Sequence, residues 1–138
     1  MLQVLIVAGV ALVALGVGWY MQQQQPDAPP PTSHTVPDQL DRNDFTRPDA
    51  PWLVIVFTSE TCATCAKVWQ AAELVDSDDV AVQNIEVSAD AALHERYAIT
   101  AVPLVAVVDA AGVTRRSFLG PPTAADLWAA LAELRGDD

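Results

Sequence analysis

Residues 52–65 read WLVIVFTSETCATC, an apolar run that leads directly into two cysteines. The run Trp52–Phe57 is continuous and rich in β-branched residues, which is typical of a central strand covered on both faces. The alanine-rich segment Thr61–Val75 predicts a helix. Its apolar side chains recur at helical spacing, namely Cys65, Val68, Trp69, Ala72 and Val75. The stretch therefore predicts a buried strand followed by a helix, with the cysteines at the junction.

Strand and helix signals continue to alternate after this stretch. Val80–Val87 and Leu104–Val108 predict two further strands, and Asp90–Ala98 predicts a short helix between them. The turn-like Asp109–Gly112 leads into a fourth strand, Val113–Leu119, which we expect to be antiparallel through a hairpin. This order of elements indicates an α/β domain of about one hundred residues.

A last helix follows the break at Gly120-Pro121-Pro122. Thr123 and Asp126 stand three residues apart, as in a capping box in which Asp replaces the usual Glu or Gln. Three leucines share one face of this helix and a tryptophan lies beside them: Leu127, Leu131, Leu134 and Trp128.

Composition excludes several classes of function. The 138 residues include 18 acidic and 7 basic side chains, for a net charge of −11. Nucleic-acid binding relies on clustered Lys and Arg, so this acidity argues against nucleic acid as a partner. It also argues against adhesion to anionic lipid headgroups. Two cysteines are too few for a disulfide-scaffolded mini-protein or a four-cysteine zinc site.

The N-terminal segment predicts a membrane anchor. Residues 2–21 are apolar except for Gln3, and twenty helical residues span roughly 30 Å, the thickness of the hydrocarbon core. Trp19 and Tyr20 stand at its far end, where amphipathic rings favour the headgroup region. The alternative is a cleaved signal peptide, but no basic residue precedes the run and Ala14-Leu15-Gly16 resembles a cleavage site only weakly. We expect a single-pass protein of the cell membrane with an uncleaved anchor at 1–21.

The positive-inside rule assigns no side of the membrane to the soluble part, because the nearest basic residues are Arg42 and Arg47. Residues 22–37, QQQQPDAPPPTSHTVP, predict a linker in extended polyproline geometry that holds the domain 38–138 away from the bilayer. Plain disorder with no spacing role is the alternative. His34 lies in this linker, where a solvated side chain is expected.

The cysteine pair is the candidate catalytic centre. A helix N-terminus carries free N–H groups and a partial positive charge, which stabilise a thiolate. A spacing of three along the first turn brings the two sulfurs within disulfide reach. The strand-to-helix corner leaves Cys62 near the surface while Cys65 faces inward. Cys62 would then attack a substrate disulfide, and Cys65 would resolve the mixed disulfide.

Other interpretations of the pair stay open. A metal site would need two more ligands, and the two histidines, His34 and His94, lie in the linker and on a distant helix. A metal site shared by two copies of the chain, an inert structural disulfide, or two buried thiols without a role are the other possibilities. We expect His94 to be exposed or partly packed on its helix, with no role.

The stretch LVIVFTSETCATC at 53–65, together with AVPL at 101–104 and FLG at 118–120, resembles the thioredoxin family over residues 38–136. The resemblance implies a mixed central sheet flanked by helices and no cofactor beyond a redox-active Cys62–Cys65 disulfide. It also implies a cis bond before Pro103, which shapes a substrate groove, and a Val102 backbone that binds extended substrate. The residues around the cysteines would line this groove: Thr61, Ala63 and Thr64. An anchor followed by a linker is similar to membrane-tethered thioredoxin-like proteins of bacteria.

Three departures from the family pattern bear on activity. Thr61 stands where the family has Trp, and Ala63-Thr64 replaces Gly-Pro. Val56 occupies the place of a buried Asp that assists proton transfer from the second thiol, so Cys65 must lose its proton to water, substrate or another group. Among the neighbours, Glu60 would disfavour a Cys62 thiolate, and Lys67 would favour it. Thr64 could donate a hydrogen bond to the Cys62 sulfur.

Two functions follow from these residues. The first is a membrane-tethered thiol–disulfide oxidoreductase that acts on protein or small-molecule thiols and disulfides, working as reductase or oxidase with an unidentified electron donor or acceptor. The second is a redox-inactive binding or scaffold module in which the cysteines are incidental. Capture of mixed disulfides by Cys62 distinguishes them.

Overall fold

A computed structural model describes Met1, Val13, Gly16 and residues 36–136. The chain separates into two units, residues 1–33 and 34–138, and the strands and helices of the predicted α/β domain all belong to the second. Most of the predicted anchor at 2–21 and most of the linker at 22–37 lie outside the described residues. Within the described part of the chain, no helix is long and apolar enough to cross a membrane.

The α/β domain follows the predicted order of elements. Along the chain these are the 3-10 helix η1 (Arg42–Asp44), β1 (Trp52–Thr58), α2 (Cys65–Glu73), β2 (Val80–Glu86), α3 (Ala91–Arg96), β3 (Leu104–Val108), β4 (Thr114–Leu119) and α4 (Ala124–Gly136). The strands form one sheet in the order β2-β1-β3-β4. β1 runs parallel to β2 and antiparallel to β3, and β3 and β4 form the predicted hairpin. The sheet is therefore mixed, as expected.

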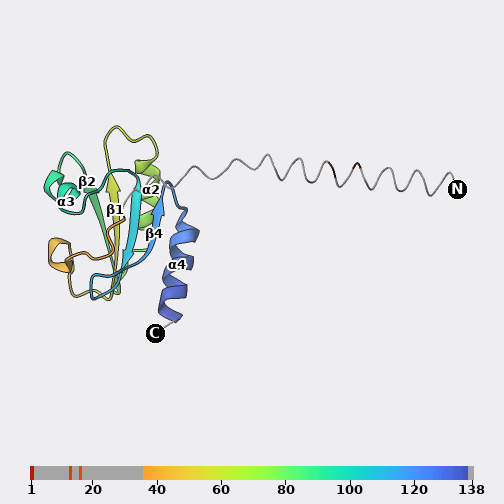
Figure 1. The fold of residues 1–138 in the computed structure, drawn as a ribbon. Coiled ribbons are helices and arrows are strands. Elements are labelled where there is room, and N and C mark those ends of the chain that lie inside the picture. Colours follow the sequence, from red (N-terminus) through yellow and green to blue (C-terminus); the bar gives the residue numbers. More distant parts are fainter. Residues whose placement is uncertain (2–12, 14–15, 17–35, 137–138) are drawn as a thin grey trace. The chain divides into compact units, whose positions relative to one another are not determined.

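Strand β1 is buried along its whole length because each face of the sheet carries its own apolar cluster. Figure 1 shows α2 and α4 on one side of the sheet and α3 with η1 on the other. Successive side chains of a strand point to opposite faces. Trp52, Val54 and Val56 accordingly join the cluster of α2 and α4, while the alternate residues Leu53 and Phe57 join the opposite one.

The predicted capping box starts α4. The Thr123 N–H donates to Asp126 Oδ2 at 2.8 Å, and the Asp126 N–H donates back to the Thr123 hydroxyl at 3.2 Å. The backbone and hydroxyl bonds from Thr123 hold the pKa of the Asp126 carboxyl below its usual value. Leu127 and Leu131 are buried on the face that this cap orients, and Trp128 is about half exposed beside them.

The prediction for His94 is wrong, because this side chain is buried rather than exposed or partly packed. Its exposed fraction is 6%. The ring lies edge-on to Phe57 with centroids 5.4 Å apart, and Nε2 is 2.9 Å from the carbonyl oxygen of Ile85. A carbonyl partner and an aromatic neighbour satisfy the imidazole inside the core. His94 therefore serves the packing of α3 on the sheet.

A segment before β1, residues 38–45, packs on the end of the sheet away from the cysteines. Leu40 donates its N–H to the carbonyl of Gly112 at 2.8 Å, and Gln39 forms a bridge with Val113 at the hairpin. The buried Arg42 donates to the carbonyls of Asp109 and Ala50, both at 2.9 Å. Sequence reasoning missed these contacts because the segment has no periodic pattern.

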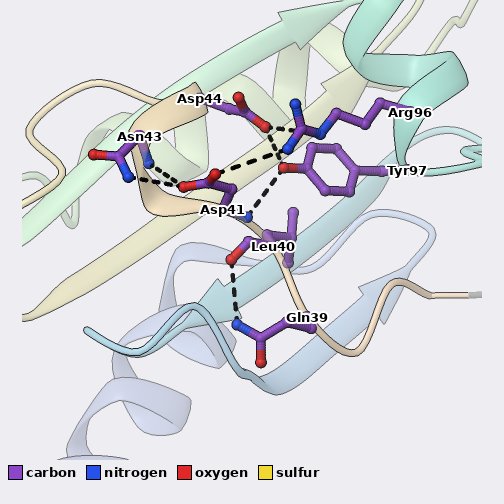
Figure 2. A network of polar contacts seen from close by, with 7 residues as sticks. All are labelled: Gln39, Leu40, Asp41, Asn43, Asp44, Arg96 and Tyr97. Atoms are coloured by element: carbon purple, nitrogen blue, oxygen red, sulfur yellow. Dashed lines mark hydrogen bonds and ion pairs between the residues drawn. The ribbon is translucent and has the colours of Figure 1, made fainter.

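A polar network fastens the same segment to the end of α3 (Figure 2). The Asp41 N–H donates to the Tyr97 hydroxyl at 3.1 Å, and that hydroxyl donates to Asp44. Arg96 adds an ion pair with Asp44, with Nε 3.2 Å from the carboxylate oxygen. Burial and the hydrogen bond to Asp44 raise the pKa of the Tyr97 hydroxyl. The network therefore covers this side of the core, and its polar groups bind one another.

The contact of Leu40 with the hairpin gives a paired test. Gly112 and Gly120 both adopt left-handed backbone, with φ of +83° and +101°. A Cβ at Gly112 would meet the carbonyl oxygen of Leu40, whereas a Cβ at Gly120 would meet no atom of the described residues within 4 Å. Gly120→Ala should therefore cost only the strain of a left-handed residue, about 1–2 kcal/mol. Gly112→Ala should lower the free energy of unfolding by at least about 1 kcal/mol more.

Urea unfolding of both variants measures these free energies. Equal losses in Gly112→Ala and Gly120→Ala would contradict the seating of residues 38–40 on the hairpin.

Candidate functional site

The two cysteines form a disulfide at the corner between β1 and α2, with their Cα atoms 5.5 Å apart. The helix was predicted from Thr61, but it begins at Cys65. The reason is a turn that begins at Ser59. The Ser59 carbonyl accepts the Cys62 N–H at 3.1 Å, and the Ser59 hydroxyl accepts the Thr61 N–H at 3.3 Å. Cys62 therefore precedes the helix, and Cys65 is the first helical residue.

The two sulfurs differ in exposure in the way the sequence predicted. Cys62 is half-buried, whereas Cys65 is only 4% exposed and lies on the buried stripe of α2 with Val68 and Ala72. The Thr64 hydroxyl lies 3.8 Å from the Cys62 sulfur, which is the contact expected of it. Cys62 is thus the sulfur that a partner can reach, and Cys65 is held behind it at the positive end of the helix.

A hollow of about 300 Å³ opens beside the disulfide. Side chains from β1, its following loop, α2 and β2 line it: Thr58, Ser59, Glu60, Cys62, Cys65, Ala66, Trp69, Asn84 and Glu86. Both cysteines border the same space, and the space is wide enough for water. A proton leaving Cys65 can therefore reach solvent through this hollow.

Val56 stands where thioredoxins carry a buried Asp. Among the described residues, the cluster around Val56 contains no carboxylate. Val56 is fully buried among apolar side chains. Its partner in the parallel register is Asn84, whose side-chain oxygen accepts a hydrogen bond from the Thr58 hydroxyl at 2.7 Å. The carboxylates that reach the hollow are Glu60 and Glu86, from the loop and the end of β2.

Sequence reasoning missed Glu86. Its carboxylate accepts N–H bonds from Ser88 at 2.8 Å, Ala89 at 3.0 Å and Glu60 at 3.2 Å. Burial raises the pKa of the Glu86 carboxyl, but the bonds from Ala89, Ser88 and Glu60 outweigh burial and leave the pKa below its usual value. One signal could have found it: the carboxyl ends of adjacent parallel strands meet at one edge of a sheet, and Glu86 ends the strand beside β1.

Pro103 lies at the same end of the sheet as the disulfide. The peptide bond between Val102 and Pro103 is cis, as predicted. Leu104 pairs with Phe57 in the antiparallel register, so the residue before Leu104 stands beside the end of β1. Pro103 is buried and Val102 half-buried, while Thr61, Ala63 and Thr64 are exposed around the disulfide. Their role in a substrate groove stays a prediction.

The interpretations based on metal find no support in the residues that the structure describes. No group of three or more His, Cys, Asp or Glu side chains there could hold a metal ion. Both sulfurs are taken by the disulfide, and His94 is buried against Phe57. His34 lies outside the described residues.

Two solved thioredoxins share this architecture. An oxidised thioredoxin from Plasmodium falciparum matches with a TM-score of 0.52 and 17% identity, over 62% of this chain and 83% of that one. A mutant thioredoxin from Halobacterium salinarum matches with a TM-score of 0.53 and 21% identity, over 72% and 90%. No protein-family model and no curated protein matches the sequence. The fold of the domain is therefore thioredoxin-like.

Proposed function

We propose that this chain is a thiol–disulfide oxidoreductase in which Cys62 is the nucleophile and Cys65 the resolving thiol. The observation that carries the proposal is the asymmetry of the pair: an accessible Cys62 is bonded to a buried Cys65 that begins a helix. An exposed thiolate next to a second, protected thiol is the arrangement that disulfide exchange requires.

The reductive cycle starts from the dithiol form. The Cys62 thiolate attacks one sulfur of a substrate disulfide, forms a mixed disulfide and expels the other substrate sulfur as a thiolate. Cys65 loses its proton, and its thiolate attacks the Cys62 sulfur. The second substrate thiolate leaves, and the Cys62–Cys65 disulfide closes. Two electrons pass to the substrate, and the two protons lost by the cysteines are balanced by the two taken up by the departing thiolates.

Each neighbour of the pair has a proposed part in this cycle. The helix start and the Thr64 hydroxyl stabilise negative charge on Cys62, while Glu60 and Glu86 oppose it. Water in the hollow takes the Cys65 proton, since Val56 offers no base. A dithiol or disulfide of another protein returns the pair to its starting state, and the direction of net electron flow depends on that partner.

The substrate is proposed to lie across the disulfide toward Pro103. Val102 offers backbone groups to an extended segment, and Pro103 shapes the floor of the groove. Thr61, Ala63 and Thr64 are exposed and border it. These small side chains favour protein or small-molecule disulfides that approach closely.

We further propose that residues 2–21 tether the domain to a bacterial membrane. The support is the length and apolarity of the run and the prolines that follow it. The full chain, expressed in bacteria, should stay in the membrane fraction after an alkaline wash, and a chain without residues 2–21 should not. After reduction in intact cells, an impermeant maleimide should label Cys62 if the domain faces outward. Loss of the full chain to the wash would contradict the tether.

The redox proposal predicts that the protein accelerates the reduction of insulin disulfides by dithiothreitol. Cys62→Ser should abolish this acceleration, because no accessible thiolate then forms. Cys65→Ser should accumulate mixed disulfides, because nothing closes the ring. Turbidity of insulin and non-reducing gels measure the two effects.

The double variant Cys62→Ser, Cys65→Ser is the control for binding without redox chemistry. If the wild type leaves insulin untouched and the double variant keeps the interaction partners of the wild type, the chain is a binding or scaffold module instead.

A further inference from the structure

We propose that Glu86 is a positioning residue that holds the Cys62 turn in place for ring closure by Cys65. Its carboxylate joins two loops that come from different parts of the chain. One oxygen, Oε1, accepts the N–H of Glu60 at 3.2 Å. The other, Oε2, accepts the N–H groups of Ser88 and Ala89 at 2.8 and 3.0 Å. The proposal rests on the proposed function, because ring closure matters only if the pair exchanges disulfides.

The contact with Glu60 acts directly on the turn that carries Cys62. Glu60 is two residues before Cys62, inside the turn whose Ser59 carbonyl accepts the Cys62 N–H. The N–H groups of Thr61 and Cys62 both bind within this turn, on Ser59. The bond from Glu60 to Glu86 ties the turn to β2 instead. Losing it would leave Cys62 freer to move relative to Cys65.

Glu86 itself stands at a well-anchored strand end. Glu86 is the last residue of β2, which pairs with β1 as far as Thr58. The next residue, Val87, donates its N–H to the Thr58 carbonyl at 3.0 Å. The carboxylate therefore extends from a fixed strand end toward a turn with mostly internal bonds. This geometry suits a side chain that positions its neighbour.

Glu86 also places a negative charge on the hollow that both cysteines line. Its bonds to backbone N–H groups hold the pKa of the carboxyl below its usual value, and a carboxyl is ionised at neutral pH in either case. The charged residues that line this space are Glu60 in the loop and Glu86 on β2, and Lys67 lies on α2 two residues after Cys65. Removing the Glu86 charge should ease ionisation of Cys62. Glu86 thus holds the turn in place and also disfavours ionisation of the Cys62 thiol.

Three variants separate these effects. Glu86→Gln keeps the size but has only one accepting oxygen, so it can serve one loop and not both. Glu86→Asp keeps the charge but is one methylene shorter, so it cannot span the gap. Asp109→Asn is the matched control. Asp109 follows β3 and accepts the N–H groups of Ala111 and Val113, both at 2.9 Å, at the end of the sheet where β1 begins.

The test follows the reduced full chain as it reacts with dithiobis(nitrobenzoate). Cys62 attacks this reagent and releases the first thionitrobenzoate, and Cys65 then attacks the Cys62 sulfur and releases the second. In both Glu86 variants, the second release should slow about fivefold, as expected for the loss of one hydrogen bond of typical net strength. In Glu86→Gln, the pKa of the Cys62 thiol, read from the pH dependence of the first release, should fall by about 0.5. Glu86→Asp should leave this pKa unchanged.

Asp109→Asn should change neither release, although it removes the charge of a carboxylate that accepts backbone N–H groups and pairs with Arg115 at the far end of the sheet. A second release as fast in both Glu86 variants as in the wild type would overturn the proposal. Equal slowing by Asp109→Asn would also overturn it, because the effect would then be general loss of stability. This reagent tests ring closure whether or not insulin is a substrate. A failure of the insulin assay alone would count against the proposed function and not against the role of Glu86.

Discussion

Strand β1 lies between β2 and β3, and every one of its seven residues is buried. A shift of one residue in its pairing would turn each apolar side chain to the wrong cluster, so both faces of the sheet hold the register. That register brings the end of β1, Glu86 at the end of β2 and Pro103 before β3 to one edge. The cysteines follow β1 at this edge, and the site exists because the strand is fixed there.

The charges around Cys62 act in opposite directions. The helix start and the Thr64 hydroxyl favour a thiolate, whereas Glu60 and Glu86 disfavour it. Val56 is buried among apolar side chains, so the described residues of that cluster offer no buried carboxylate that could take a proton from Cys65. The carboxylates near the pair, Glu60 and Glu86, border the hollow instead. Glu86 also accepts the N–H of Glu60 and so ties the turn that carries Cys62 to β2.

Sequence reasoning succeeded where the signal was local. The apolar run at Trp52–Phe57 and the capping box at Thr123 each depend on neighbouring residues, and the structure confirms them. The cis bond before Pro103, which the resemblance to thioredoxins implies, is also present. It failed where contacts join distant segments. His94 was expected to be exposed or partly packed because nothing in its helix reveals the Ile85 carbonyl, and Glu86 was not singled out because its partners lie in two loops. The segment 38–45 had no pattern because its contacts lie on the hairpin and on Tyr97.

The central claim is that the Cys62–Cys65 disulfide opens and closes at biological potentials. The most direct measurement is its reduction potential, from equilibrium with glutathione or dithiothreitol buffers followed by trapping of free thiols. The half-buried Cys62 and the buried Cys65 behind it predict a value in the range of exchange proteins, roughly −270 to −120 mV. A value below about −300 mV, typical of structural disulfides, would contradict the claim.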